Sequence, residues 1–274
     1  LDLRPLSLGE ILDRTFSLYR SHFLLFIGIA GIPQLIVFAF QLVQITLQPL
    51  NPGSIAAFGS LGSVLLTIVA AIVGIIAYLI SQAATVLAVS DLYLGRQVLL
   101  APALQRARGH LGFLFGVICL NGLAIMGGLI LLIIPGIYFA CRLLVCVPAA
   151  LIEERSPRES ISRSWNLTRG FAGRAFMICL LFFVIAIAAA TLFTFPFTLA
   201  ALSALKDPAT LRLWTALVDA GNRIGSILTE PILLIATAIF YYDLRVRKEA
   251  FDLQFMMDPN AAPPAGPGSV PSIL

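Results

Sequence analysis

The sequence predicts an all-α polytopic membrane protein with six transmembrane helices. Of its 274 residues, 59% are hydrophobic and only 12% are charged, whereas a soluble domain has about 45–50% apolar and 25% charged residues. The mean hydropathy of +0.96 agrees with this composition. A soluble fold of this length could not bury so large an apolar share, so much of the chain must lie in lipid.

Six apolar runs are long enough, or nearly so, to cross the bilayer core, which needs about 20 apolar residues. No charged residue occurs between His22 and Asp91, and the turn-forming stretch 48–53 divides that region into two spans. A Pro-Gly pair at 135–136 separates the third span from a short fourth one. The predicted spans are 23–47, 61–90, 111–134, 137–152, 175–201 and 224–242.

The basic residues indicate which way the spans are oriented. Six spans place both termini on one side, and we assign only Lys206, Arg212 and Arg223 to the opposite side. Because cytoplasmic loops are enriched in Lys and Arg, both termini are predicted to be cytoplasmic. The same rule explains a net charge of +4 without a nucleic-acid partner. The basic residues on the terminal side are Arg4, Arg14, Arg20, Arg96, Arg106, Arg108, Arg155, Arg158, Arg163, Arg169, Arg174, Arg245, Arg247 and Lys248.

Amphipathic helices are predicted to lie at the cytoplasmic membrane surface, over residues 8–21, 101–109 and 157–170. Ser7 and Glu10 have the spacing of a capping box, in which each side chain bonds the other residue's backbone N–H. An apolar stripe follows at helical spacing, which is typical of a helix lying in the headgroup plane. The residues expected to contact anionic phospholipid headgroups are Arg14, Arg20, Arg108, Arg163 and Arg169.

The first of these segments recurs later in the chain, which predicts an internal repeat of a surface helix followed by a transmembrane hairpin. A second capping box at 156–159 matches the first, and a middle copy near 101–110 is weaker. The matched pairs are Glu10 with Glu159, Arg14 with Arg163, and Arg20 with Arg169.

Two charged residues fall inside predicted spans, where an isolated charge is costly. Arg142 and Glu230 both lie roughly 8–9 Å from the outer end of their spans, at 1.5 Å per residue. Their opposite charges and matched depth predict an ion pair between spans four and six. A substrate or proton site is the alternative interpretation, and Pro231 predicts a kink beside Glu230.

Nothing in the sequence predicts an enzyme. The four cysteines have no metal-ligand spacing, and no hydrolase, protease or phosphate-binding motif occurs. We therefore expect no catalytic residue, no metal and no cofactor. Residues 1–255 are predicted to form a single membrane domain, and the Pro- and Gly-rich segment 256–274 a disordered cytoplasmic tail. The chain begins at Leu1 rather than Met, as an N-terminally truncated fragment would.

Several short blocks resemble a known bacterial family, the membrane domain of glycerophosphoryl diester phosphodiesterase. They are the opening 4–14 with Tyr19 and Arg20, the stretch 134–138 with Arg142, the block 159–170, and 241–245, which reads Tyr-Tyr-Asp-Leu-Arg. The family is named after proteins that join such a domain to a soluble phosphodiesterase. The resemblance implies a membrane module without the catalytic barrel, and it carries over no catalytic residue.

The expected function is a non-catalytic module of the bacterial inner membrane that organises lipids or partner proteins. The alternative is a small transporter or lipid-handling protein that uses the outer-side region of Arg142 and Glu230.

Overall fold

Every element in the described part of the chain is an α-helix. The computed structural model describes residues 5–47, 61–93, 95–205 and 207–249, and the predicted tail 256–274 lies outside these ranges. The helices are α1 (Leu8–Ser21), α2 (Phe23–Leu47), α3 (Leu61–Tyr93), α4 (Leu100–Arg108), α5 (Leu111–Leu131), α6 (Ile133–Arg142), α7 (Cys146–Glu153), α8 (Pro157–Leu167), α9 (Ala172–Ser203) and α10 (Pro208–Glu249).

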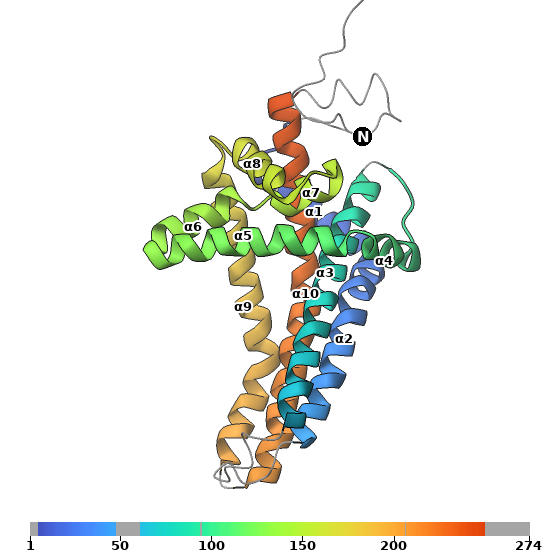
Figure 1. Cartoon of the computed structure of the whole chain (residues 1–274), viewed down its shortest axis with the longest axis vertical. Helices are drawn as coiled ribbons and strands as arrows, with labels where there is room; N and C mark the ends of the chain where they lie inside the picture. The colour runs from blue at the N-terminus through green and yellow to red at the C-terminus, as the bar shows by residue number, and fades with distance from the viewer. Residues whose placement is uncertain (1–4, 48–60, 94, 206, 250–274) are drawn as a thin grey trace, which may run out of the picture.

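Four long helices, α2, α3, α9 and α10, run side by side as a bundle (Figure 1). Helix α10 contacts the other three and has 42 residues. At 1.5 Å per residue it is roughly 63 Å long, about twice the thickness of the bilayer core. One end of α10 must therefore project out of the hydrocarbon, and it carries the polar cap described below.

Among the described residues, six helical segments are long and apolar enough to cross a membrane, which is the number predicted. The two that do not belong to the bundle are α5 and the α6–α7 segment. Helices α5 and α6 form a hairpin that lies across the bundle axis near one end (Figure 1). Its tip is apolar and exposed, with Ile130 81% and Ile134 80% accessible. Side chains of this kind need a hydrocarbon environment around the hairpin.

The boundary between the third and fourth predicted spans differs from the prediction. The chain is extended at Leu132, whereas Pro135 and Gly136 lie inside the first turn of α6. Proline is tolerated in a first turn because its missing N–H has no partner there. Gly136 instead allows close packing, because a Cβ at Gly128 would lie 3.0 Å from the Gly136 Cα. The predicted span 137–152 is also divided, since α6 ends at Arg142 and α7 begins at Cys146.

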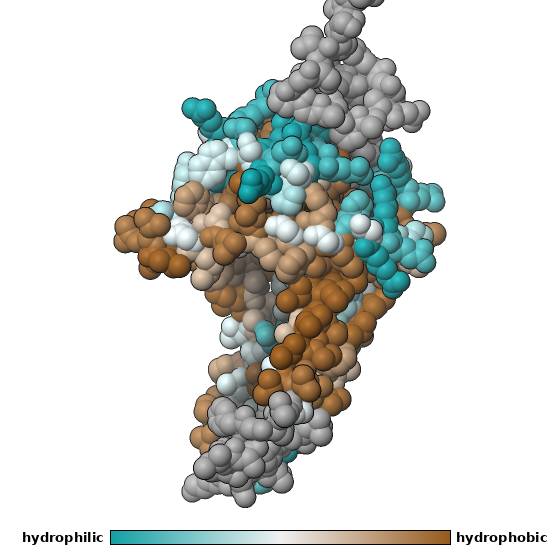
Figure 2. Space-filling view, viewed as in Figure 1, coloured by the Kyte–Doolittle hydropathy of each residue, from teal (hydrophilic) through white to brown (hydrophobic). Residues whose placement is uncertain are grey.

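Helices α1, α4, α7 and α8 gather at the end of the bundle where α10 ends, and we call this end the polar cap (Figure 1). Hydrophilic residues concentrate on this end, above an apolar band that covers the hairpin and the bundle (Figure 2). Three cap helices fall where surface helices were predicted. Helix α1 and the end of α10 lie at the same end of the bundle. The described chain therefore runs along the length of the bundle an even number of times.

The two predicted capping boxes are present. The Glu10 amide donates to the Ser7 hydroxyl at 3.2 Å, and the Ser7 amide donates to the Glu10 carboxylate at 2.6 Å. The Ser156 amide likewise donates to the Glu159 carboxylate at 3.2 Å. Each box bonds N–H groups that a helix start would otherwise leave without a partner. The internal repeat of a surface helix followed by a transmembrane hairpin stays a prediction.

Helices α9 and α10 approach closely at Gly221, and this contact gives a test of the bundle. A Cβ at Gly221 would overlap the backbone carbonyl of Phe193. We expect Gly221→Ala to destabilise the protein by about 1–3 kcal/mol, because backbone atoms cannot move aside cheaply. Thermal unfolding of the detergent-solubilised protein measures the effect.

The matched control is Gly74→Ala in α3, where a Cβ would meet open space. It should be neutral or stabilise the helix by up to about 1 kcal/mol. Equal unfolding temperatures for the two variants would contradict the close contact.

Candidate functional site

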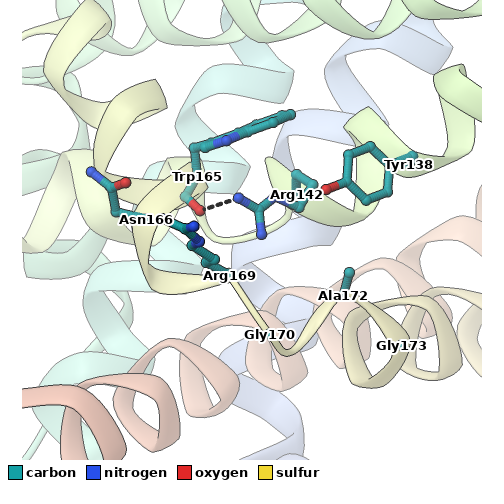
Figure 3. A pocket seen from close by; sticks show the side chains of 8 residues that line it. All are labelled: Tyr138, Arg142, Trp165, Asn166, Arg169, Gly170, Ala172 and Gly173. Atoms are coloured by element: carbon teal, nitrogen blue, oxygen red, sulfur yellow. Dashed lines mark hydrogen bonds between the residues drawn. The ribbon is translucent and has the colours of Figure 1, made fainter.

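A basic hollow lies in the corner between α6, α8 and the start of α9. It has a volume of about 620 Å³, and Figure 3 shows the side chains around it. No Asp or Glu is among its lining residues. They are Tyr138, Arg142, Trp165, Asn166, Arg169, Gly170, Ala172 and Gly173, and we call this site the Arg142 pocket.

Arg142 is the central residue of the pocket and is only 4% exposed. Its Nη2 donates to the Trp165 carbonyl at 2.6 Å. Its guanidinium carbon lies 4.4 Å from the centroid of the Trp165 ring and 5.8 Å from that of Tyr138. The buried Nε has no hydrogen-bond partner in the structure. A buried donor without a partner is costly, and the cost is larger when the group is charged.

Helix α8 fixes the backbone at Arg142. Because α6 ends there, its last carbonyls have no partner within the helix. The hydroxyls of Ser164 and Thr168 both donate to the Arg142 carbonyl at 2.9 Å. These buried bonds hold Arg142 against Trp165 and fix the direction of its side chain.

The other side of the pocket is the connection from α8 to α9. Arg169 is exposed and lies two residues past the end of α8. Gly170 then has φ +87°, a left-handed conformation that glycine adopts without strain. This turn brings the first residues of α9, Ala172 and Gly173, to the pocket wall. The first N–H groups of a helix have no internal partner and attract negative charge.

The structure does not bring Arg142 and Glu230 together. Lys248, near the end of α10, is close enough to Arg142 for their charges to interact. Glu230 lies 18 positions earlier on the same helix, which corresponds to roughly 27 Å. Its carboxylate instead faces the side chains of Gln34 and Gln82, and one carboxylate oxygen is buried without a partner. Arg142 therefore belongs to the polar cap and not to the outer end of the bundle.

The ion-pair prediction failed because it treated span four as one straight helix. The chain turns at Leu143–Val145, so this segment is two helices and not one. Helix α6 lies across the bundle beside α5. Pro231 lies inside α10, which continues as one helix on both sides of it. The predicted kink stays a prediction.

Of the five arginines expected at headgroups, Arg163 has a different role. It donates to Glu153 at 2.8 Å and to Glu249 at 2.8 Å. Burial by itself lowers the pKa of Arg163, but the hydrogen bonds to the two carboxylates outweigh burial and raise the pKa. Its charge is therefore paired with two carboxylates inside the cap.

The other four arginines lie on or near the surface of the cap. Arg14 donates to the Tyr93 hydroxyl at 3.3 Å. Arg20 and Arg108 are exposed near the ends of α1 and α4. Arg169 lines the Arg142 pocket, so only this one of the five shares a site with Arg142.

Two groups of polar residues were not predicted as such. In the cap, Asp243 accepts from the Leu6 amide at 2.7 Å, Arg174 at 3.2 Å and Arg247 at 2.9 Å. The available signal was that Asp91 and Asp243 each directly follow a predicted span. Asp243 pairs with Arg174 and Arg247, which had been counted only among the basic residues of the terminal side.

The second unpredicted group lies inside the bundle. Arg223 donates to Gln34 at 2.9 Å and also to Gln41, and Gln41 donates to Asp219 at 2.7 Å. The sequence places these residues on α2 and α10 at helical spacing, but it does not show which faces meet. Arg223 therefore belongs to the bundle interior and not to an outer loop.

The fold and the cap together define a multi-pass α-helical membrane protein with a polar end. Residues 112–250 match the family model described as the membrane domain of glycerophosphoryl diester phosphodiesterase. The match covers about half of the chain, from α5 to the end of α10, and the chain belongs to this family. No curated protein and no solved structure matches the chain. The family is defined by the membrane domain and not by the catalytic domain of the phosphodiesterase.

The distance between Arg142 and Glu230 predicts how the effects of their substitutions on stability combine. Arg142→Leu and Glu230→Leu should lower stability independently, because sites more than about 7–10 Å apart add to within about 0.5 kcal/mol. By contrast, Glu153→Gln and Arg163→Gln should show a coupling energy of about 0.5–3 kcal/mol, since those side chains are in contact.

Thermal unfolding of each single and double variant in detergent gives both coupling energies. Recovery of stability in the Arg142/Glu230 double variant would show that the two charges interact after all.

Proposed function

We propose that the protein is a non-catalytic module of the bacterial cytoplasmic membrane that organises anionic phospholipid at its cytoplasmic face. This proposal rests on one observation: charged side chains gather at one end of the bundle, and the surface seen below that end is mostly apolar (Figure 2). Lys and Arg residues gather on the polar cap, while the hairpin and the bundle expose apolar side chains. Cytoplasmic loops of membrane proteins have this enrichment in basic residues.

The length of the bundle helices supports an orientation with the bundle axis along the membrane normal. Helices α9 and α10 have 32 and 42 residues, and a passage needs about 20. In this orientation the α5–α6 hairpin lies in the membrane plane, within the cytoplasmic leaflet. The cap helices then lie at headgroup level, where anionic lipid attracts each nearby Lys or Arg by about 1 kcal/mol.

The alternative of a transporter depended on a shared site of Arg142 and Glu230. Arg142 lies near Lys248 at the end of α10, whereas Glu230 lies near the middle of that helix, so their separation does not support a shared site. Membership of a family defined by a membrane domain also supports a module over an enzyme.

A reporter fusion tests the orientation. Alkaline phosphatase fused to the C-terminus of the full chain should be inactive, because the even number of passages and the basic cap keep that end in the cytoplasm. The same reporter fused after residue 205, between α9 and α10, should be active. Activity of the C-terminal fusion would reverse the proposed orientation.

Bound lipid tests the function. The protein extracted in mild detergent should carry a larger share of anionic phospholipid than the membrane from which it came, because the exposed arginines of the cap attract negative headgroups. Mass spectrometry of the co-purified lipid measures this share. A multi-pass protein without a basic cap, extracted from the same cells, is the control. Equal lipid compositions for the two proteins would contradict the proposal.

A further inference from the structure

We propose that the Arg142 pocket binds the phosphate group of one anionic phospholipid from the cytoplasmic leaflet. This inference rests on the proposed function for the orientation of the cap. It adds a defined site to the diffuse attraction of a basic surface, with Arg142 and Arg169 as the charged residues that hold the phosphate.

The charge and the unsatisfied donors of the pocket point to an anion. Two arginines and the start of α9 line it, and no acidic side chain does. Arg142 is almost fully buried, yet its Nε has no partner. The guanidinium of Arg142 lines the pocket (Figure 3), so a phosphate bound there would accept hydrogen bonds from it, and phosphate is the anion for which this planar group is best suited. Helix starts bind phosphate for the same electrostatic reason.

The pocket is organised before any ligand arrives. The bond from Arg142 to the Trp165 carbonyl and its stacking on the Trp165 ring leave the guanidinium little freedom (Figure 3). Because this side chain is already ordered, binding has less conformational entropy to overcome. Arg142 also covers the Trp165 ring, so the ring face is not open to a cationic headgroup such as choline.

The surroundings favour a lipid over a free phosphate. Along α9, Gly173 is followed at helical spacing by Met177 and Leu180, which lie on the same side of the helix. Both side chains are exposed, as is Ile137 on α6 beside Tyr138. A headgroup in the pocket would place its acyl chains along this apolar surface below the α5–α6 hairpin. A soluble phosphate would leave that surface uncovered.

The test compares three variants of the full chain purified in detergent. Arg169→Gln and Arg142→Gln each remove one charge from the pocket, and Arg158→Gln removes an exposed charge from the same cap outside it. Native mass spectrometry then titrates each protein with dioleoyl phosphatidylglycerol and with dioleoyl phosphatidylcholine. Each charge-assisted hydrogen bond contributes enough that its loss should weaken phosphatidylglycerol binding about tenfold or more.

We expect this loss for Arg169→Gln and Arg142→Gln and less than a twofold change for Arg158→Gln. Phosphatidylcholine should bind weakly to all of them. Arg142 is buried, so its variant could fail to fold. Arg169 is exposed and follows the end of α8, and its variant decides the question by itself if Arg142→Gln unfolds.

The remaining outcomes separate the site from the general function. If the unmodified protein prefers phosphatidylglycerol and all three variants retain that preference equally, the pocket is not the site, while the proposed function stands. If the unmodified protein shows no preference, the proposed function fails as well. If inorganic phosphate displaces the lipid at equal concentration, the ligand is a soluble phosphate and the lipid assignment is overturned.

Discussion

Two buried carboxylates connect the polar cap to the bundle, and the rest of the structure depends on them. The side chain of Glu153 is 1% exposed and that of Asp243 is 0% exposed. Glu153 accepts from Arg163 and from the Tyr241 hydroxyl at 2.7 Å. Removing an ion from water costs several kcal/mol, so such groups are tolerated only where several donors surround them. Glu153 accepts from Tyr241 of α10, and Asp243 itself lies on α10, so this helix helps to fix where the cap lies.

Helix α10 is one continuous helix that lies in two environments, the apolar bundle and the polar cap. Its middle lies among α2, α3 and α9, and its last turns are buried among the helices of the cap. In hydrocarbon a helix satisfies its own backbone, so side chains need only pack there. In the cap, the side chains of α10 also bond other segments, as when the Leu6 carbonyl accepts from Arg247 at 2.5 Å. The same helix thus joins the bundle to the cap and fixes the position of one relative to the other.

Most elements could be predicted from the sequence, because apolar runs and capping boxes are local signals. The helix at 8–21 and the apolar span of α9 follow directly from them. The orientation of the α5–α6 hairpin does not, since α5 is apolar on all sides and such a helix can lie along or across a bundle. The partners of Arg163 were also not predictable. Its carboxylates come from α7 and α10, which are distant in sequence.

The feature that was misinterpreted in the sequence is also the one that forms the candidate site. A straight fourth span would have placed Arg142 in the outer half of the membrane, where it would need a carboxylate. Instead the helix ends at Arg142, and its carbonyl, which this end leaves without a partner, accepts from Ser164 of α8 and from Thr168, the residue after that helix. Those bonds place the guanidinium beside Trp165 and Arg169, where it donates to the Trp165 carbonyl and no carboxylate lines the pocket. A buried guanidinium without a carboxylate beside it favours an anionic ligand, which is the reason we propose a headgroup phosphate for this pocket.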